Sequence, residues 1–452
     1  TANTKDSALW AYKNLTVNGD VEAENSRNAT LYTGNGSVSV TGSVTVDSTA
    51  TGIAAVFSKG DVTIGGDVNA TSAENMGIYS INGSITIGGN TEGTCKDSVL
   101  WASKDVEVTG SVNVKSTINA ALYAGNGTIN ITGDVTAAST TNGIATVFAT
   151  KDITIGGKTN VSSENHMGIY TSGGSISIGG DAEGSSKDAF IFASKDVSIT
   201  GKVNASSSTN ATLFAGSGNI TVGGDVDVTC NATSNVAAIE ARQGDVSLKS
   251  NATVISTSEQ GIAGKEVKMT TGTWDVTASK TAIVGYSGIT IPDTHGITHP
   301  IDGKFNQVTE ELSAGVTTTY HTVTESDGTT IAAHAIIEPV FTVTVTDGTA
   351  DKAEAFKGDT VTITANDKSG YTFKKWQIVS GEITLADASA KTTTFVMTAS
   401  DVDVKATYTK NSSGGGGGGG YTYYTIKATA GVNGSISPAG SVSVRSGKDQ
   451  TF

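Results

Sequence analysis

Proline is almost absent from this sequence. The only prolines are Pro292, Pro300, Pro339 and Pro438, so residues 1–291 contain none. A proline inside a β-sheet removes a hydrogen-bond donor from the ladder, and it is tolerated mainly at edges and bulges. The long proline-free segment therefore favours a continuously hydrogen-bonded β-structure.

Charged residues are also scarce. They form 16% of the 452 residues, whereas an average soluble domain has about 25%. The 29 Lys and Arg residues are outnumbered by 43 Asp and Glu residues, which gives a net charge of −14. An acidic chain is a poor partner for nucleic acid, so we expect no nucleic-acid binding. No apolar run reaches the roughly 18 residues of a membrane span, so we expect no span in this fragment.

The sequence is instead rich in Gly, Ser, Thr, Asn and Val, with 56 glycines against only 4 methionines. These residue types form strands and turns more readily than helices. Disordered chains are rich in Pro, Glu and Lys, which is the reverse of this composition. We therefore predict an all-β fold. The chain begins at Thr1 without a secretory signal, so we expect a trimmed product that is truncated at both ends.

Two internal periods dominate residues 1–300. Asp6, Asp97 and Asp188 each begin a similar segment, and they are 91 residues apart. Within these segments a strand signature that contains glycine recurs every 21 to 24 residues, at Gly19, Gly42, Gly66, Gly89, Gly110, Gly133, Gly157, Gly180, Gly201 and Gly224. Short repeats of this kind are typical of a solenoid. We predict a parallel β-helix (β-solenoid) of about 23 residues per coil, with roughly thirteen coils up to Pro292 and the usual right-handed sense.

An aromatic residue occupies the same position in ten consecutive coils: Trp10, Tyr32, Phe57, Tyr79, Trp101, Tyr123, Phe148, Tyr170, Phe192 and Phe214. The preceding residue is always aliphatic, as in Leu9 and Leu31. Neighbours on a strand point to opposite faces, so we expect the aliphatic residues inside and the aromatic ones outside, in a stripe about 43 Å long. Such a stripe is a candidate surface for stacking sugar rings. The alternative is a bend in the strand that buries both columns.

A second column holds small residues: Asn25, Ser48, Ser72, Cys95, Ser116, Ser139, Ser163, Ser186, Ser207 and Cys230. Cys95 and Cys230 lie six coils apart in it, which corresponds to about 29 Å. A disulfide needs Cα atoms within about 7 Å. We therefore predict that the two cysteines do not pair and that each replaces a serine in a small-residue ladder.

The remaining chain changes pattern. We expect a capping hairpin or connector over residues 301–339, with its turn at Asp327-Gly328. We predict a small β-sandwich or β-grasp-like domain over residues 340–410, a flexible glycine-rich linker over 411–420, and a truncated second module over 421–452, which we expect to be poorly packed.

Residues 340–410 carry the motifs of a known repeat. They include Gly358-Asp-x-Val-x-Ile363, Gly370-Tyr-x-Phe-x-x-Trp376, Phe395-Val-Met397 and Val402-x-Val-x-Ala-x-Tyr408. This segment resembles the divergent internalin B-type repeat, although Thr398 stands where that repeat usually has proline. The start of the second module resembles the same repeat. The resemblance implies a bacterial surface or adhesin-type protein. Attachment to the cell wall is also implied by the resemblance alone, because no anchor motif is visible in this sequence.

Catalytic and metal sites are not indicated. Parallel β-helix enzymes that cleave acidic polysaccharides build clefts from long loops, whereas the coils here vary little in length. His295 and His299 have ligand-like spacing, but Pro292, Gly296 and Pro300 prevent the helix that would align them. We interpret the aspartates near the coil corners mainly as solvated turn residues, with calcium binding as the alternative. We expect no enzyme activity, no cofactor and no metal site.

Two functional hypotheses follow. The first is a non-enzymatic extracellular stalk or adhesin on the cell surface. The second is a polysaccharide-binding rod that uses the aromatic column, with a polysaccharide lyase or hydrolase as a weaker third possibility. The expected partners are polysaccharides of the cell wall, the host or the environment, or a surface protein.

Overall fold

The computed structural model describes residues 2–4, 6–25, 28–48, 52–140, 143–313, 316–411 and 420–452, and every regular element in these ranges is a β-strand. The chain divides into two compact units, Thr1–Val340 and Phe341–Phe452. The all-β prediction is therefore confirmed.

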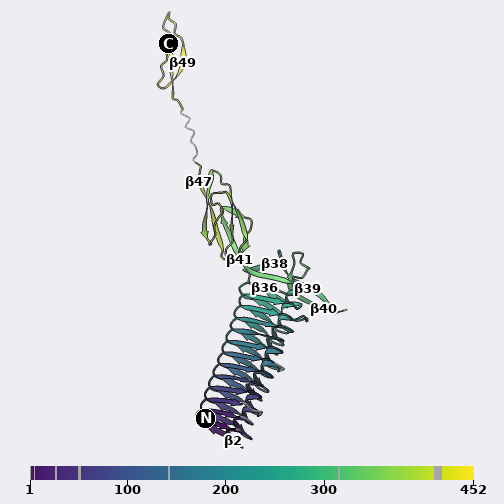
Figure 1. The fold of residues 1–452 in the computed structure, drawn as a ribbon. Coiled ribbons are helices and arrows are strands. Elements are labelled where there is room, and N and C mark those ends of the chain that lie inside the picture. The colour runs from purple at the N-terminus through teal and green to yellow at the C-terminus, as the bar shows by residue number, and fades with distance from the viewer. Residues whose placement is uncertain are drawn as a thin grey trace. The chain divides into compact units, whose positions relative to one another are not determined.

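The first unit is a parallel β-solenoid of about 12 turns, as the periods predict (Figure 1). Each coil has three strands, which stack on their counterparts in the next coil and so form three faces, called here A, B and C.

Face A contains β1 (Ala2–Thr4), β4 (Val21–Asn25), β7 (Val44–Ser48), β10 (Val68–Ser72), β13 (Thr91–Cys95), β16 (Val112–Ser116), β19 (Val135–Ser139), β22 (Thr159–Ser163), β25 (Ala182–Ser186), β28 (Val203–Ser207), β31 (Val226–Cys230), β34 (Ala252–Ser256) and β36 (Trp274–Thr277). Face B contains β2 (Leu9–Ala11), β5 (Leu31–Thr33), β8 (Ala54–Ser58), β11 (Met76–Ser80), β14 (Leu100–Ala102), β17 (Leu122–Ala124), β20 (Ala145–Ala149), β23 (Met167–Thr171), β26 (Ile191–Ala193), β29 (Leu213–Ala215), β32 (Ala237–Ala241) and the first halves of β35 (Gln260–Met269) and β37 (Thr281–Thr290). Face C contains β3 (Leu15–Val17), β6 (Val38–Val40), β9 (Val62–Ile64), β12 (Ile85–Ile87), β15 (Val106–Val108), β18 (Ile129–Ile131), β21 (Ile153–Ile155), β24 (Ile176–Ile178), β27 (Val197–Ile199), β30 (Ile220–Val222), β33 (Val246–Leu248) and the second halves of β35 and β37.

The coils pair in the register that the sequence periods imply. On face A, Val68 pairs with Val44 in the preceding coil and with Thr91 in the following one. Strand β7 alternates strictly, so that Val44 and Val46 enter the core while Thr45 and Asp47 face outward. The core is thus a set of stacked aliphatic columns, because like side chains lie above one another in successive coils.

The predicted ladder of small residues is present, and it lies inside the solenoid. Ser72, Cys95 and Ser116 pair in sequence through face A and are almost completely buried. Both cysteines are free. Burial raises the pKa of the Cys95 thiol to about 12, so this thiol stays protonated near neutral pH. The cysteines therefore act as ladder residues. Asn25, the first member of the predicted column, pairs with Ser48 through the backbone.

The corner between faces C and A depends on glycine. A Cβ atom at Gly88 would lie 2.3 Å from the carbonyl oxygen of Gly65, one coil earlier. Because that oxygen belongs to the backbone, the coil itself would have to move to admit a side chain. The glycine that recurs at the coil period is the next residue, Gly89, where a Cβ atom would lie 2.7 Å from the backbone nitrogen of Asp67 and 2.7 Å from the carbonyl carbon of Gly66. That close approach explains the recurrence.

Antiparallel strands cover the last coil. They are β38 (His295–His299), β39 (Lys304–Ser313), β40 (Val316–Thr324) and the first half of β41 (His334–Thr346). Strand β41 pairs with β36 and β38, and its residues Ala335 and Ile337 are buried in the solenoid core. Strand β40 pairs along its length with β39. Its end also pairs antiparallel with the segment after the turn at Asp327 and Gly328, through Thr324 and Ile331. A short hairpin therefore turns at Asp327-Gly328, and β39 adds a longer hairpin partner on the other edge of β40.

The second unit begins with the end of β41. It continues through β42 (Gly348–Ala350), β43 (Glu354–Phe356), β44 (Thr360–Ala365), β45 (Tyr371–Ser380), β46 (Thr392–Val396) and β47 (Val402–Lys410). Strands β44, β46, β45 and β47 share a core around Trp376 and Phe395. The predicted strands of this segment are all present. A separate hairpin of β48 (Tyr423–Ala428) and β49 (Gly440–Arg445) has mostly exposed side chains.

The corner geometry generates a stability prediction. We expect Gly89→Ala to lower the free energy of unfolding by about 1–3 kcal/mol, because the new methyl group would overpack against the backbone of Gly66 and Asp67. Gly288→Ala is the matched control, since nothing lies within 4 Å of a Cβ at that position, and it should change stability by less than about 0.5 kcal/mol. Denaturant unfolding of both variants measures the difference, and equal effects would refute the close-packed corner.

Candidate functional site

The ten aromatic side chains lie on the outside of face B. The aliphatic residues before them are fully buried in nine coils, whereas Leu9 in the first coil is 40% exposed. Leu31, Leu100 and Leu213 are fully buried in the solenoid core, whereas none of the ten aromatic rings belongs to that core. The rings therefore point away from the solenoid core. We call this set the aromatic ladder.

Each ring of the ladder contacts the next, with centroids 4.3 to 6.4 Å apart. Trp101 and Tyr123 are parallel to within 7°, whereas Tyr79 meets Trp101 edge-on at 84° and Tyr170 meets Phe192 at 80°. Stacked and edge-on contacts of this kind add to the energy of apolar burial. Many ring faces are consequently occupied by the neighbouring ring.

Side chains beside the ladder cover part of it. Ala29, Ala54 and Met76 form a small cluster with Phe57 and its neighbouring rings. The exposed fraction is 8% for Phe57, 6% for Phe148 and 4% for Phe214, against 63% for Trp10. The expectation of a uniformly exposed stripe is therefore wrong for the three phenylalanines. Alanine and methionine side chains pack beside Phe57 and Phe148, and the Arg242 guanidinium lies over the ring of Phe214.

Two shallow hollows on the ladder are related by the 91-residue period. One of about 470 Å³ is lined by Trp10, Asn28, Tyr32 and Ile53. The other, of about 260 Å³, is lined by the equivalent residues Trp101, Asn119, Tyr123 and Ile144. In both, the asparagine amide donates to the aspartate that begins the repeat, Asp6 or Asp97. The repeated sequence thus gives a repeated surface.

The corner aspartates connect successive coils. Asp67 Oδ1 accepts the backbone N–H of Asn90 at 2.7 Å, and Asp134 Oδ1 accepts that of Lys158 at 2.7 Å. The same bond to the coil that follows is made by Asp20, Asp61, Asp105, Asp152, Asp181 and Asp196. Their interpretation as solvated turn residues is therefore incomplete. Each one satisfies a backbone donor that the turn would otherwise leave to water.

Asp181 shows the electrostatic consequence. The backbone N–H of Lys202 and, after it, the side chain of Lys158 hold the pKa of this carboxyl below its ordinary value. Because the folded pKa is the lower one, the carboxylate adds stability above the pKa of the unfolded chain and loses it as the pH falls. In the described ranges, no three His, Cys, Asp or Glu side chains converge as a metal site would require.

The two histidines with ligand-like spacing serve different contacts. His295 Nε2 lies 3.1 Å from the carbonyl oxygen of Gly272, and burial lowers the pKa of His295. His299 instead packs against His334, with ring centroids 4.3 Å apart, and His334 Nε2 lies 2.8 Å from Asp275 Oδ1. The structure therefore does not bring His295 and His299 together.

A pocket lies where the ladder ends, and sequence reasoning missed it. In the ladder register Phe214 pairs with Glu240, and Glu240 with Ala263, so the aromatic column gives way to an acid and then to a small residue. A pocket of about 260 Å³ lies at this break. One wall is formed by the last coils of face B, and the other by the hairpin of β39 and β40. The break in the aromatic column at Glu240 is the signal in the sequence that could have pointed to it.

The ladder generates a prediction about stability. We expect Phe148→Ala to cost about 3 kcal/mol, because it removes a buried ring and leaves a cavity between its neighbours. Trp10→Ala should cost less than about 1 kcal/mol, because most of Trp10 is in water. Thermal and urea unfolding of the two variants provide the comparison, and equal costs would contradict a ladder that stabilises the coils.

Residues 340–412 match the family model of the divergent InlB B-repeat domain. No curated protein and no solved structure gives a significant match to the chain. In the part of the chain that the structure describes, no helix has the length and hydropathy of a membrane span. Domains of this repeat type are typical of bacterial surface proteins. The matched repeat, following a β-solenoid in the same chain, therefore fits a bacterial surface repeat protein.

Proposed function

We propose that the protein is a non-enzymatic component of the bacterial cell exterior in which the solenoid serves as a stiff spacer. The observation that carries this proposal is the in-register pairing of each coil with the next along three faces. At about 4.8 Å per coil, 12 turns correspond to a rod of about 58 Å. A rod of this kind keeps the segments attached to its two ends a fixed distance apart.

The chemistry of the corners supports a structural role. The aspartates that could have served as catalysts or ligands accept backbone N–H groups from the neighbouring coil. Coils of nearly constant length leave only shallow hollows on the ladder. Polysaccharide cleavage would require convergent acids in a deep cleft. The corner aspartates and the hollows on the ladder provide neither, so a lyase or hydrolase along the coils is the least supported of the three hypotheses.

Polysaccharide binding along the ladder is a second candidate. It is favoured by the recurrence of the same Trp, Tyr and Asn hollow after 91 residues. The stacking of Trp101 on Tyr123 and of Phe192 on Phe214 counts against it, because those ring faces are already covered. We therefore propose that the ladder mainly stabilises the rod and that the protein as a whole serves as a stalk.

Deletion of one complete repeat tests the spacer. Removing residues 97–187 joins residue 96 to Asp188, which has the register of Asp97, so we expect a folded rod that is shorter by four coils or about 19 Å. Removing residues 97–176 is the matched control, because it breaks the register and should prevent folding. Electron microscopy of the full chain and its variants measures the length, and circular dichroism reports folding.

Intact cells of the source organism provide the functional readout. An antibody against residues 341–411 should label cells that carry the natural chain, and should label them less well when residues 97–187 are deleted. Absence of labelling on intact cells would contradict the surface location. Unchanged access after shortening, or cleavage of a polysaccharide by the purified full chain, would contradict the non-enzymatic spacer.

A further inference from the structure

The pocket at the end of the ladder has an apolar floor. Ala263 occupies the register position that aromatic rings fill in ten earlier coils, and it is buried together with Ala241. Because alanine has almost no side chain, a space opens outside face B at this level. Tyr320 from β40 packs on Ala263 and Val284 at one side of it.

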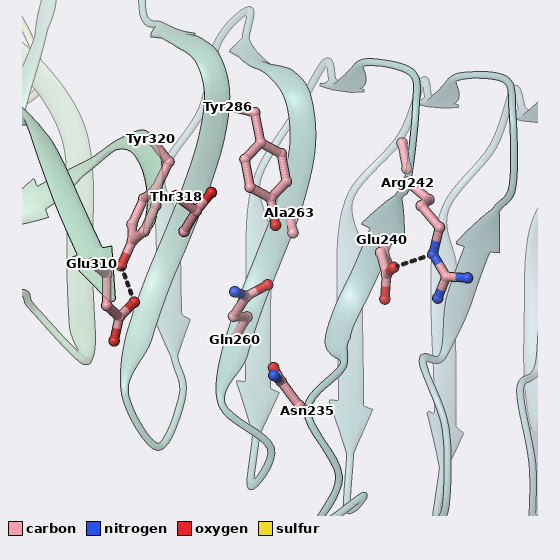
Figure 2. Close-up of a pocket in the computed structure, with 10 residues that line it drawn as sticks. Asn235, Glu240, Arg242, Gln260, Ala263, Tyr286, Glu310, Thr318 and Tyr320 are labelled. Atoms are coloured by element: carbon pink, nitrogen blue, oxygen red, sulfur yellow. Dashed lines mark hydrogen bonds and ion pairs between the residues drawn. The ribbon is translucent and has the colours of Figure 1, made fainter. Parts of the chain in front are cut away.

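The walls bring polar groups from five strands, β32, β35, β37, β39 and β40, to this space (Figure 2). On one side Glu240 accepts a hydrogen bond from Arg242 at 3.1 Å, and the guanidinium lies 4.8 Å from the centre of the Phe214 ring. On the other side Tyr320 donates to Glu310 Oε2 at 3.0 Å. Figure 2 shows Gln260 and Tyr286 between these two pairs.

Tyr286 and Tyr320 provide the aromatic surface. Their ring centroids are 6.4 Å apart and the planes are inclined by 72°, so one ring does not cover the face of the other. Tyr286 is 45% exposed, unlike the stacked phenylalanines of the ladder. A ring with an open face beside hydrogen-bonding groups is suited to an amphipathic ligand.

The charges of the pocket restrict the ligand. Glu240 and Glu310 supply two negative charges against the single positive charge of Arg242, and that charge is already paired. Burial raises the pKa of Tyr320 to about 12, with a further contribution from Glu310. Both phenols therefore stay neutral near pH 7. The excess of one negative charge disfavours the binding of anionic ligands and allows neutral or cationic ligands to bind.

We propose that this pocket binds a pyranose residue without negative charge, namely a neutral sugar or an amino sugar of a polysaccharide. The C–H face of the sugar lies on Tyr286. Its hydroxyl groups donate to Glu240 and Glu310, accept from Arg242, and can both donate to and accept from Gln260.

The size of the pocket agrees with a small ligand. Its volume of about 260 Å³ is below the roughly 300–1,000 Å³ of sites for drug-sized ligands, which suits one sugar unit. The carboxylates, the amides of Gln260 and Asn235 and the Thr318 hydroxyl offer both donors and acceptors. Vicinal hydroxyl groups, which are donors and acceptors at once, are complementary to that mixture.

This inference is independent of the stalk proposal. A rod that carries a sugar site near its last coil remains a rod if the site proves empty. It also differs from binding along the ladder, because the ladder rings at Tyr79 and Trp101 are outside the pocket. Variants at the two places therefore separate the two hypotheses.

Ligand-detected NMR and calorimetry with the full chain test the proposal. The probes are the methyl glycosides of glucose, galactose, mannose and glucosamine. The methyl glycoside of galacturonic acid, with its carboxylate free, is the acidic comparison. We expect at least one neutral or amino sugar to bind and the galacturonate to bind at least about tenfold more weakly, a ratio equivalent to 1.4 kcal/mol. Tyr286→Ala and Glu310→Gln should each weaken binding about tenfold or more.

Matched controls identify the site. Tyr12→Ala removes a tyrosine that is exposed on the solenoid outside the pocket, and Glu107→Gln neutralises an exposed acid on β15; both should leave binding unchanged, as should Tyr79→Ala in the ladder. If Tyr286→Ala fails to fold, the sugar affinities of Gln260→Ala and Glu310→Gln test the proposal instead. The proposal is overturned if no sugar binds at about 10 mM, if galacturonate binds best, or if the folded pocket variants bind like the natural chain.

Discussion

Every residue of the solenoid lies about 4.8 Å from its counterpart one coil away, and this single constraint determines most of the structure. A side chain at that spacing is always in contact with the equivalent side chain of the next coil. Columns of like residues are the outcome: aliphatic residues inside, serine and cysteine at the inner corner, aromatic rings outside. The same spacing brings Gly88 against Gly65 and lets Asp67 reach the backbone of Asn90.

The constraint weakens where the sequence stops repeating. After Phe214 the ladder position holds Glu240 and then Ala263, and the cap of β38 to β41 replaces the next coil. At this end of the solenoid the pairing becomes antiparallel, and the register shifts between β35 and β37. The pocket lies at this transition, because a missing ring and an added hairpin together enclose a space that no regular coil provides.

How well each feature can be predicted depends on how far apart in the sequence the interacting residues lie. The all-β solenoid, its register and the inward or outward direction of Leu31 and Tyr32 could be predicted, since they depend on period and alternation alone. The partial cover over Phe57 could not, because it depends on how Ala29 and Met76 fold across a corner. The hydrogen bonds from backbone N–H groups to the corner aspartates could not be predicted either, because they depend on the path of each turn in space. The pocket required knowledge that β39 and β40 return to the last coils, a contact that no local pattern specifies.

Disulfide trapping measures the register directly. Thr63 pairs with Thr86, and Thr86 pairs with Glu107, on face C. The account predicts that the double variant Thr63→Cys with Thr86→Cys forms an intramolecular disulfide on mild oxidation, because adjacent coils bring the Cα atoms within bonding range. Thr63→Cys with Glu107→Cys should not cross-link, since two coils separate those Cα atoms by about 9.6 Å. Efficient cross-linking of the second pair, or none of the first, would contradict a solenoid built on this register.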